Sequence, residues 1–307
     1  MPLELATLSD TQIRTLEPDK TLFLFAAGVF EGHGPHLPVG LDFLEAGELA
    51  RRVAKGIERK AKGWNVVLLP PAPVGVDTAS GGGLRLAIRA HVVRDWLVDT
   101  CRGLCRVGFR NFACVSGGLG PRQMSAIEEA GTLLARRYRF SFRKGSKPRL
   151  FSLSALFVTK ADVLRGPLIP EPLEHGGARD TSVALQIAPD SVEASYKGLS
   201  FAEKTGRGML WRVSENRRVG PSAYWGDPSK ASAAEGDREL DREADKIVEE
   251  LVPALLSGEA PSRKFRTAYS YLPPNRSFFL AWMLFVAMLA VMVAWMAIFV
   301  GGFTGGE

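Results

Sequence analysis

The chain has 307 residues, of which 46% are hydrophobic and 23% are charged. This is the balance of an ordinary globular protein, and the length fits one large domain or two modest ones. The net charge of +6 comes without a basic stripe that carries aromatic residues, which argues against nucleic-acid binding. The cysteines are odd in number and irregularly spaced, so we expect buried thiols and no disulfide framework. They are Cys101, Cys105 and Cys114.

The first half of the chain alternates between two kinds of apolar pattern. The run TLFLFAAGV at 21–29 predicts a strand that is buried on both faces. Apolar residues then recur at helical spacing over 43–62, which predicts a helix. The run NVVLLP at 65–70 predicts a second short strand, because two prolines end it. A glycine-rich loop follows this strand.

The alternation continues through the second half. We expect helices over 86–106 and 124–138, strands at 111–116 and 149–158, and a last amphipathic helix over 235–256. Strands and helices in this order predict a three-layer α/β/α fold with a mostly parallel central sheet. In such a fold, sites form where loops leave the carboxyl ends of strands.

The C-terminal region predicts a membrane anchor. Residues 278–300, FFLAWMLFVAMLAVMVAWMAIFV, carry no charge, and a helix of that length spans about 30 Å of hydrocarbon. We therefore expect a transmembrane helix at 277–301 with a tail at 302–307; the alternative is a buried core helix. The linker before it, 257–276, contains the basic residues Arg263, Lys264, Arg266 and Arg276. By the positive-inside rule, the domain at 1–256 is expected to be cytoplasmic.

Polar residues gather directly after the first strand. The stretch EGHGPHLPVGLD at 31–42 offers carboxylate and imidazole ligands from Glu31, His33 and Asp42. Mixed sets of histidine and carboxylate suit Zn, Mn or Fe with open positions for water. The alternative is a polar loop in which Asp42 caps the following helix.

This stretch resembles the first signature of the creatininase family, which are metal-dependent amidohydrolases. That signature has a Glu, an x-His-Gly-x-His-Leu-Pro core, and an Asp six residues after the second His. The run HGGARDTS resembles the family's His-Ala-Gly-x-x-Glu-Thr-Ser block, with Gly176 in place of Ala and Asp180 in place of Glu. The run GDPSKASAAEG at 226–236 resembles a late Gly-Asp-Pro block of the family. The similarity covers roughly residues 15–255.

The resemblance implies a dinuclear site for a divalent metal, Zn or Mn or else Fe, and with the departure described below we expect one or two ions in each chain. The implied ligands are Glu31, His33, Asp42 as the bridge, and Asp180. His175 would be the catalytic acid/base at the amide nitrogen, and the substrate a small molecule with an amide or cyclic-amide bond. His36 would orient the loop or line the pocket, and Gly34 would shape the loop. Family members commonly form hexamers, so a homo-oligomer is expected.

One half of the implied site departs from the family pattern. The strand GFRNFACVS leads into a stretch where the family has Asn-Gly-His-Gly-Gly-Asn, and here Gly118 replaces the ligand His. Two functions therefore stay open. The chain is a membrane-anchored amidohydrolase, or it is an impaired or inactive relative that serves as a membrane-anchored scaffold or binding module.

Overall fold

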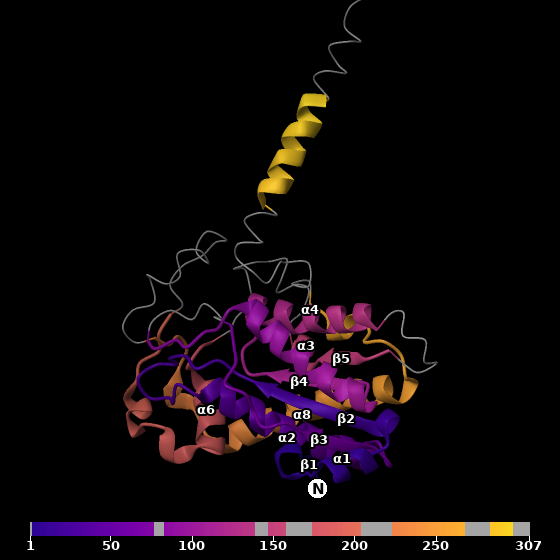
Figure 1. Ribbon diagram of the computed structural model, residues 1–307. Helices are drawn as coiled ribbons and strands as arrows, with labels where there is room; N and C mark the ends of the chain where they lie inside the picture. The colour runs from indigo at the N-terminus through magenta and orange to yellow at the C-terminus, as the bar shows by residue number, and fades with distance from the viewer. Residues whose placement is uncertain are drawn as a thin grey trace, which may run out of the picture.

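The structure, a computed structural model, describes residues 2–76, 83–138, 147–157, 174–203, 223–267 and 283–296. At its centre is a five-stranded sheet with the order β1-β3-β2-β4-β5 (Figure 1). All four neighbouring pairs are parallel. The strands are β1 (Leu3–Glu4), β2 (Thr21–Ala27), β3 (Asn65–Leu68), β4 (Asn111–Ser116) and β5 (Arg149–Ser152).

The central strand β2 is buried along its whole length, and its side chains supply two separate cores. Because successive side chains of a strand point to opposite faces, Leu22 and Leu24 enter one core while Phe23 and Phe25 enter the other. A strand covered on both faces has no need of polar residues, which explains its continuous apolar run.

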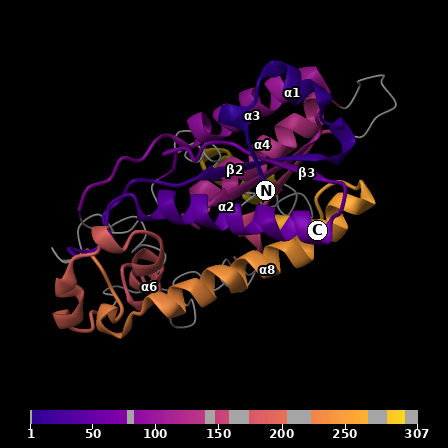
Figure 2. The same ribbon diagram turned by 90° about the horizontal axis from the view of Figure 1, so that it is seen from below.

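Helices cover both faces of the sheet, as expected for a three-layer fold. On one face α2 and α8 run side by side, with α6 against them (Figure 2). On the other face lie α3 and α4, with α1 beside them. These helices are α1 (Asp10–Thr15), α2 (Leu41–Lys60), α3 (Ala90–Val107), α4 (Pro121–Arg137), α6 (Ala178–Ile187) and α8 (Ala233–Ser257).

The contact between α2 and α8 is close because α2 carries a glycine there. A Cβ on Gly56 would lie 2.6 Å from Cγ2 of Val248. Ser232 begins α8 by accepting a hydrogen bond from the backbone N–H of Glu235, and Gly258 ends it in the left-handed conformation. These two features set the ends of α8, which packs along α2, and the first turn of α2 carries part of the candidate site.

Most predicted elements lie within a few residues of their observed bounds. The last predicted strand, 149–158, is shorter than expected, since it ends at Ser152 and a 3₁₀ segment, Leu153–Phe157, follows. Ser154 explains the change: its hydroxyl accepts a hydrogen bond from the N–H of Ser116 and donates one to the carbonyl of Ser116, in place of further strand pairing. Helix α6 and strand β1 were not predicted. All three cysteines are free and buried, as expected.

The predicted membrane segment is only partly described. Residues 283–296 form a helix with exposed side chains, and the rest of 277–301 lies outside the described residues, as does the tail. No helix within the described part of the chain combines the length and the apolar character that crossing a membrane requires.

Candidate metal centre

The candidate site begins in the loop that leaves the carboxyl end of β2. Two flanking segments hold this loop through the backbone. The N–H of Glu31 donates to the carbonyl of Val39 at 2.9 Å, and the N–H of Gly32 donates to the carbonyl of Leu84 at 2.8 Å. The side chains of Glu31 and His33 are both buried, each with an exposure of 2%. The loop is therefore fixed in place and turned inward.

His33 is oriented at both ring nitrogens. Its Nδ1 donates to the carbonyl of Glu31 at 3.0 Å, because a carbonyl oxygen can only accept. Its Nε2 lies 3.2 Å from Oδ1 of Asp42, the second residue of α2. Burial lowers the pKa of His33, but the negative charges of Asp42, Asp180 and Glu31 outweigh burial and raise this pKa to about 10. The positively charged form of His33 is therefore favoured beside Asp42.

His175 stacks on His33 and comes from a segment that is distant in the sequence, just before α6. Two backbone hydrogen bonds pair His175 with Trp225, at 3.1 and 2.9 Å. The His175 ring lies between the rings of His33 and Trp225, with centroid distances of 4.2 and 4.9 Å. Its Nε2 donates to the carbonyl of Gly32 at 2.9 Å. Burial and the charge of His33 lower the pKa of His175 to about 4, so the ring is neutral at pH 7.

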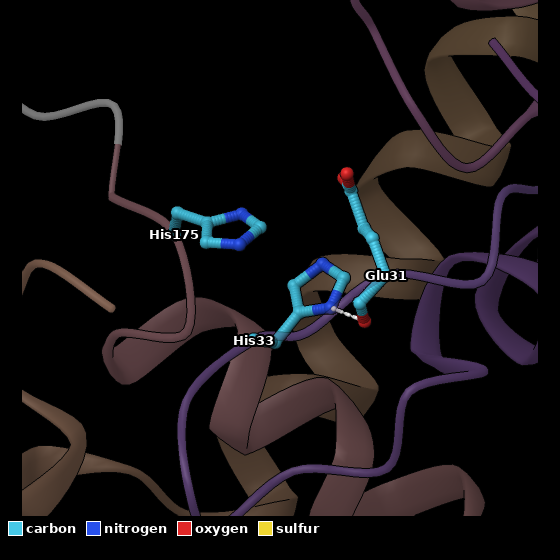
Figure 3. A group of neighbouring side chains, drawn as sticks. All are labelled: Glu31, His33 and His175. Atoms are coloured by element: carbon cyan, nitrogen blue, oxygen red, sulfur yellow. Dashed lines mark hydrogen bonds between the residues drawn. The ribbon is translucent and has the colours of Figure 1, made fainter. Parts of the chain in front are cut away.

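The three side chains converge on one point. One ligand atom from each of Glu31, His33 and His175 lies within 4.8 Å of the other two, and all three residues are buried. In Figure 3 the His175 ring points toward the space beside the Glu31 carboxylate and the His33 ring. In both histidines one ring nitrogen is tied to a backbone carbonyl, which is the usual arrangement of metal-binding histidines.

Asp180, the fourth implied ligand, is bonded to other groups of the protein. Its Oδ2 accepts from the N–H of Gly176 at 2.8 Å, and its Oδ1 pairs with Arg179 at 3.1 Å. Arg179 also pairs with Glu45 of α2 at 2.5 Å and Glu243 of α8 at 2.7 Å. Burial raises the pKa of Asp180, but Arg179 and the two histidines outweigh it and lower that pKa. The Asp180 side chain, which is one methylene shorter than the Glu of the family pattern, therefore bonds to residues at the start of α6.

The loop after β4 lies against Asp42, beside the candidate site. A Cβ on Gly117 would lie 2.0 Å from the carbonyl oxygen of Asp42, so this loop packs directly against the first turn of α2. Ser116 turns its hydroxyl inward and donates to the carbonyl of Gly118 at 2.7 Å. The facing half of the site is therefore in position, but residues 116–121 contain no imidazole or carboxylate.

His36 lies beside the cluster and outside it. Its Nε2 is 2.8 Å from the hydroxyl of Thr181, and its ring meets Tyr224 edge-on. Burial lowers the pKa of His36 to about 4. Gly34 adopts a φ of +99°, which favours glycine and turns the loop between the two histidines. Gly34 therefore shapes this loop, and His36 is buried against Thr181 and Tyr224.

Sequence reasoning missed Arg179 and Trp225. Arg179 stands next to Asp180, yet its carboxylate partners come from α2 and α8, far away in the sequence. Trp225 directly precedes the GDPSKASAAEG block. The resemblance of that block to the family was therefore a sequence signal for this position. The structure shows why the block matters locally, since it begins beside His175. Asp77 and the rest of its loop over 77–82, and residues 204–222, lie outside the described residues.

Comparison with known proteins identifies the family of this chain. The sequence pattern of creatininase (creatinine amidohydrolase) matches residues 6–251. The chain therefore belongs to the creatininase family. No curated protein sequence matches it.

Solved structures with the same fold include creatininases. A crystal structure of creatinine amidohydrolase has a TM-score of 0.61 at 18% identity, covering 83% of this chain and 98% of that one. A creatininase described with Mn has a TM-score of 0.62, also at 18% identity, covering 83% and 99%. A putative creatinine amidohydrolase from Bacteroides fragilis NCTC 9343 has a TM-score of 0.57 at 21% identity, covering 83% and 96%.

Proposed function

We propose that this protein is a divalent-metal-dependent amidohydrolase that cleaves an amide or cyclic-amide C–N bond of a small molecule. The observation that carries the proposal is the buried group of Glu31, His33 and His175 at the carboxyl end of β2, in a chain of the creatininase family. Creatininases have been described with Mn and in a Zn-Zn type, and one mutant creatininase is complexed with creatine.

The donor set suits such an ion. Glu31 and His33 supply one oxygen and one nitrogen, and Asp42 adds a carboxylate 3.2 Å from the same nitrogen. Two carboxylates and neutral imidazoles are ligands for Zn, Mn or Fe. When bound, the ion would lower the pKa of a water molecule and polarise a carbonyl oxygen. The protein's share is to fix these ligands in a buried loop that backbone hydrogen bonds to Val39 and Leu84 hold.

A panel of small amides tests this function. The full chain would be loaded with Zn²⁺ or Mn²⁺ and offered creatinine and other cyclic and linear amides, and the release of amine or carboxylate would be measured. Activity should disappear on chelation, return on adding metal, and be absent from His33→Ala. Hydrolysis that persists in His33→Ala or after chelation would contradict the proposal.

One observation favours a second function. Gly118 stands where the family pattern has a ligand histidine, and Asp180 is held by Gly176 and Arg179. These two features favour a binding module or scaffold. A chain that binds metal but hydrolyses no amide in the panel would have this second function.

We also propose that residues 277–301 attach the protein to a membrane, with the α/β domain on the cytoplasmic side, and that the chain forms a homo-oligomer, a hexamer by resemblance. The apolar run and the basic residues before it support the attachment. Removing residues 277–307 should move the protein from the membrane fraction to the soluble fraction. A truncated chain that stays with the membrane would overturn the anchor.

Light scattering of the detergent-solubilised full chain would give the oligomeric state.

A further inference from the structure

We infer that His175 is a ligand of a single divalent ion, together with Glu31 and His33, so that the two-ion site implied by the family is here a one-ion site. This inference rests on the proposed metal dependence and specifies its ligands.

The ring nitrogens of His175 carry the first part of the argument. Gly32 offers a carbonyl oxygen to Nε2 at 2.9 Å, and a carbonyl can only accept, so Nε2 holds the proton. In the neutral ring, the lone pair is then on Nδ1. A ring held this way offers one nitrogen to a cation and has its only N–H engaged. It is therefore built as a ligand, and it has no proton to give to a leaving nitrogen.

His33 is also tied to a backbone carbonyl at one ring nitrogen. Its Nδ1 donates to the carbonyl of Glu31 at 3.0 Å, and its Nε2 faces Oδ1 of Asp42 at 3.2 Å, where a metal ion would take the place of the proton. The two rings are stacked 4.2 Å apart at an angle of 28°, and Trp225 covers the far face of His175 at 4.9 Å. Packing therefore fixes both ring planes, and the Glu31 carboxylate completes the group within 4.8 Å. Two histidines and one carboxylate with open positions form a recognised single-metal ligand set.

A second ion lacks ligands among the described residues. Gly117 brings the loop after β4 against Asp42, but residues 116–121 contain no imidazole or carboxylate, and the Ser116 hydroxyl is engaged by the carbonyl of Gly118. Asp180 is bonded to Gly176 and Arg179, and the latter is held by two glutamates. Asp42, whose Oδ1 lies 3.2 Å from Nε2 of His33, is the remaining implied ligand, and one carboxylate does not make a second site.

Metal stoichiometry and affinity test the inference. The metal-free full chain would be titrated with Co²⁺ and with Zn²⁺, following heat and the visible absorption of Co²⁺. We expect one ion per chain. His175→Ala should weaken binding at least about 100-fold, because losing even a residue that orients a ligand costs 10–100-fold. The matched control is His91→Ala on α3, a histidine away from the cluster, which should bind as the wild type does.

X-ray absorption of the Zn²⁺-loaded wild type gives a measurement that needs no variant. Scattering from imidazole rings should count two histidines for each ion. One histidine per ion, two ions per chain, or unchanged affinity in His175→Ala would each overturn this inference while leaving metal dependence in place. A wild type that binds neither Co²⁺ nor Zn²⁺ would overturn the proposed function as well.

Discussion

The imidazole rings of His33 and His175 are stacked with their centroids 4.2 Å apart. His33 follows β2 and His175 precedes α6, so this contact joins two segments that are far apart in the sequence. The backbone supports it, since Gly176 passes directly over the carbonyl of His33. The loop at 31–42 and the start of α6 therefore form one unit, and changes in either should be felt in both.

Gly176 is predicted to be intolerant of a side chain. It has a φ of +64°, and a Cβ there would lie 2.0 Å from the carbonyl oxygen of His33. Gly63 is the matched control, because its φ is +84° but nothing lies within 4 Å of its Cβ position. Gly63→Ala should cost about 1 kcal/mol of unfolding free energy from strain alone. Gly176→Ala should cost at least about twice that, since backbone must move.

Urea denaturation of the two variants measures this difference, and metal titration of Gly176→Ala should show weaker binding. Equal losses of stability in Gly176→Ala and Gly63→Ala would mean that the close approach to His33 is not a constraint.

Arg179 is predicted to hold α2, α6 and α8 together. Its partners Glu45 and Glu243 have side chains only 8% and 15% exposed, so removing the guanidinium leaves them unpaired. Breaking a fully buried pair costs about 3–5 kcal/mol. Arg179 itself is 34% exposed, so Arg179→Ala should cost somewhat less, about 2–4 kcal/mol. Burial raises the pKa of Glu45 to about 7, against the effect of Arg179, so losing Arg179 should raise it further.

Arg51→Ala is the control for that measurement. Arg51 pairs with Glu48 on the surface of α2, with side-chain exposures of 51% and 28%. Its removal should change the free energy of unfolding by less than about 1 kcal/mol. Similar losses in both variants would contradict the role given to the Arg179 cluster.

The buried histidines should give the metal-free protein a stability maximum near pH 6.5. The pKa of His33 is raised to about 10, so its contribution is complete below pH 6.5 and is lost as pH rises toward 10. The pKa values of His36 and His175 are lowered to about 4, so the unfolded chain binds more protons between pH 6.5 and 4, and stability falls as pH falls through that range.

Denaturation of chelator-treated protein across pH 4.5 to 9.5 checks both slopes. Asp42→Asn removes the carboxylate beside His33 and should flatten the alkaline slope while leaving the acid slope. An alkaline slope that is the same in Asp42→Asn would show that another group causes it.

Metal should stabilise the folded chain. An ion that binds only the folded state at 100 times its Kd adds about 2.7 kcal/mol. Zn²⁺ should therefore raise the Tm of the wild type, and a chelator should reverse the increase. His33→Ala should show no such increase. A wild-type Tm that does not respond to Zn²⁺, Mn²⁺ or Co²⁺ would contradict a folded-state metal site.

The sequence was most informative where one pattern had one physical cause. The apolar run of β2 predicted a strand buried on both faces, because no other short element needs apolar residues on every side. The signature at 31–42 pointed to Glu31 and His33 mainly through its resemblance to the creatininase family, and its place directly after a strand end added less. The same region's Asp42 was open to two readings, and the structure places it within reach of His33.

The rest depends on contacts that sequence spacing does not contain. Asp180 stands where the family has Glu, yet its carboxylate is bonded to Gly176 and Arg179, and only the packing of α2, α6 and α8 reveals this. The position of His175 beside His33, with Trp225 behind it, likewise follows from the fold.

The most direct measurement is the metal content of the purified full chain, compared with that of His33→Ala. His33 is the residue that touches every other member of the site: it lies 3.2 Å from Asp42, stacks on His175 and bonds to the carbonyl of Glu31. Elemental analysis should find about one Zn or Mn per wild-type chain and almost none in His33→Ala. A wild type without metal, or a variant that retains it, would contradict the account.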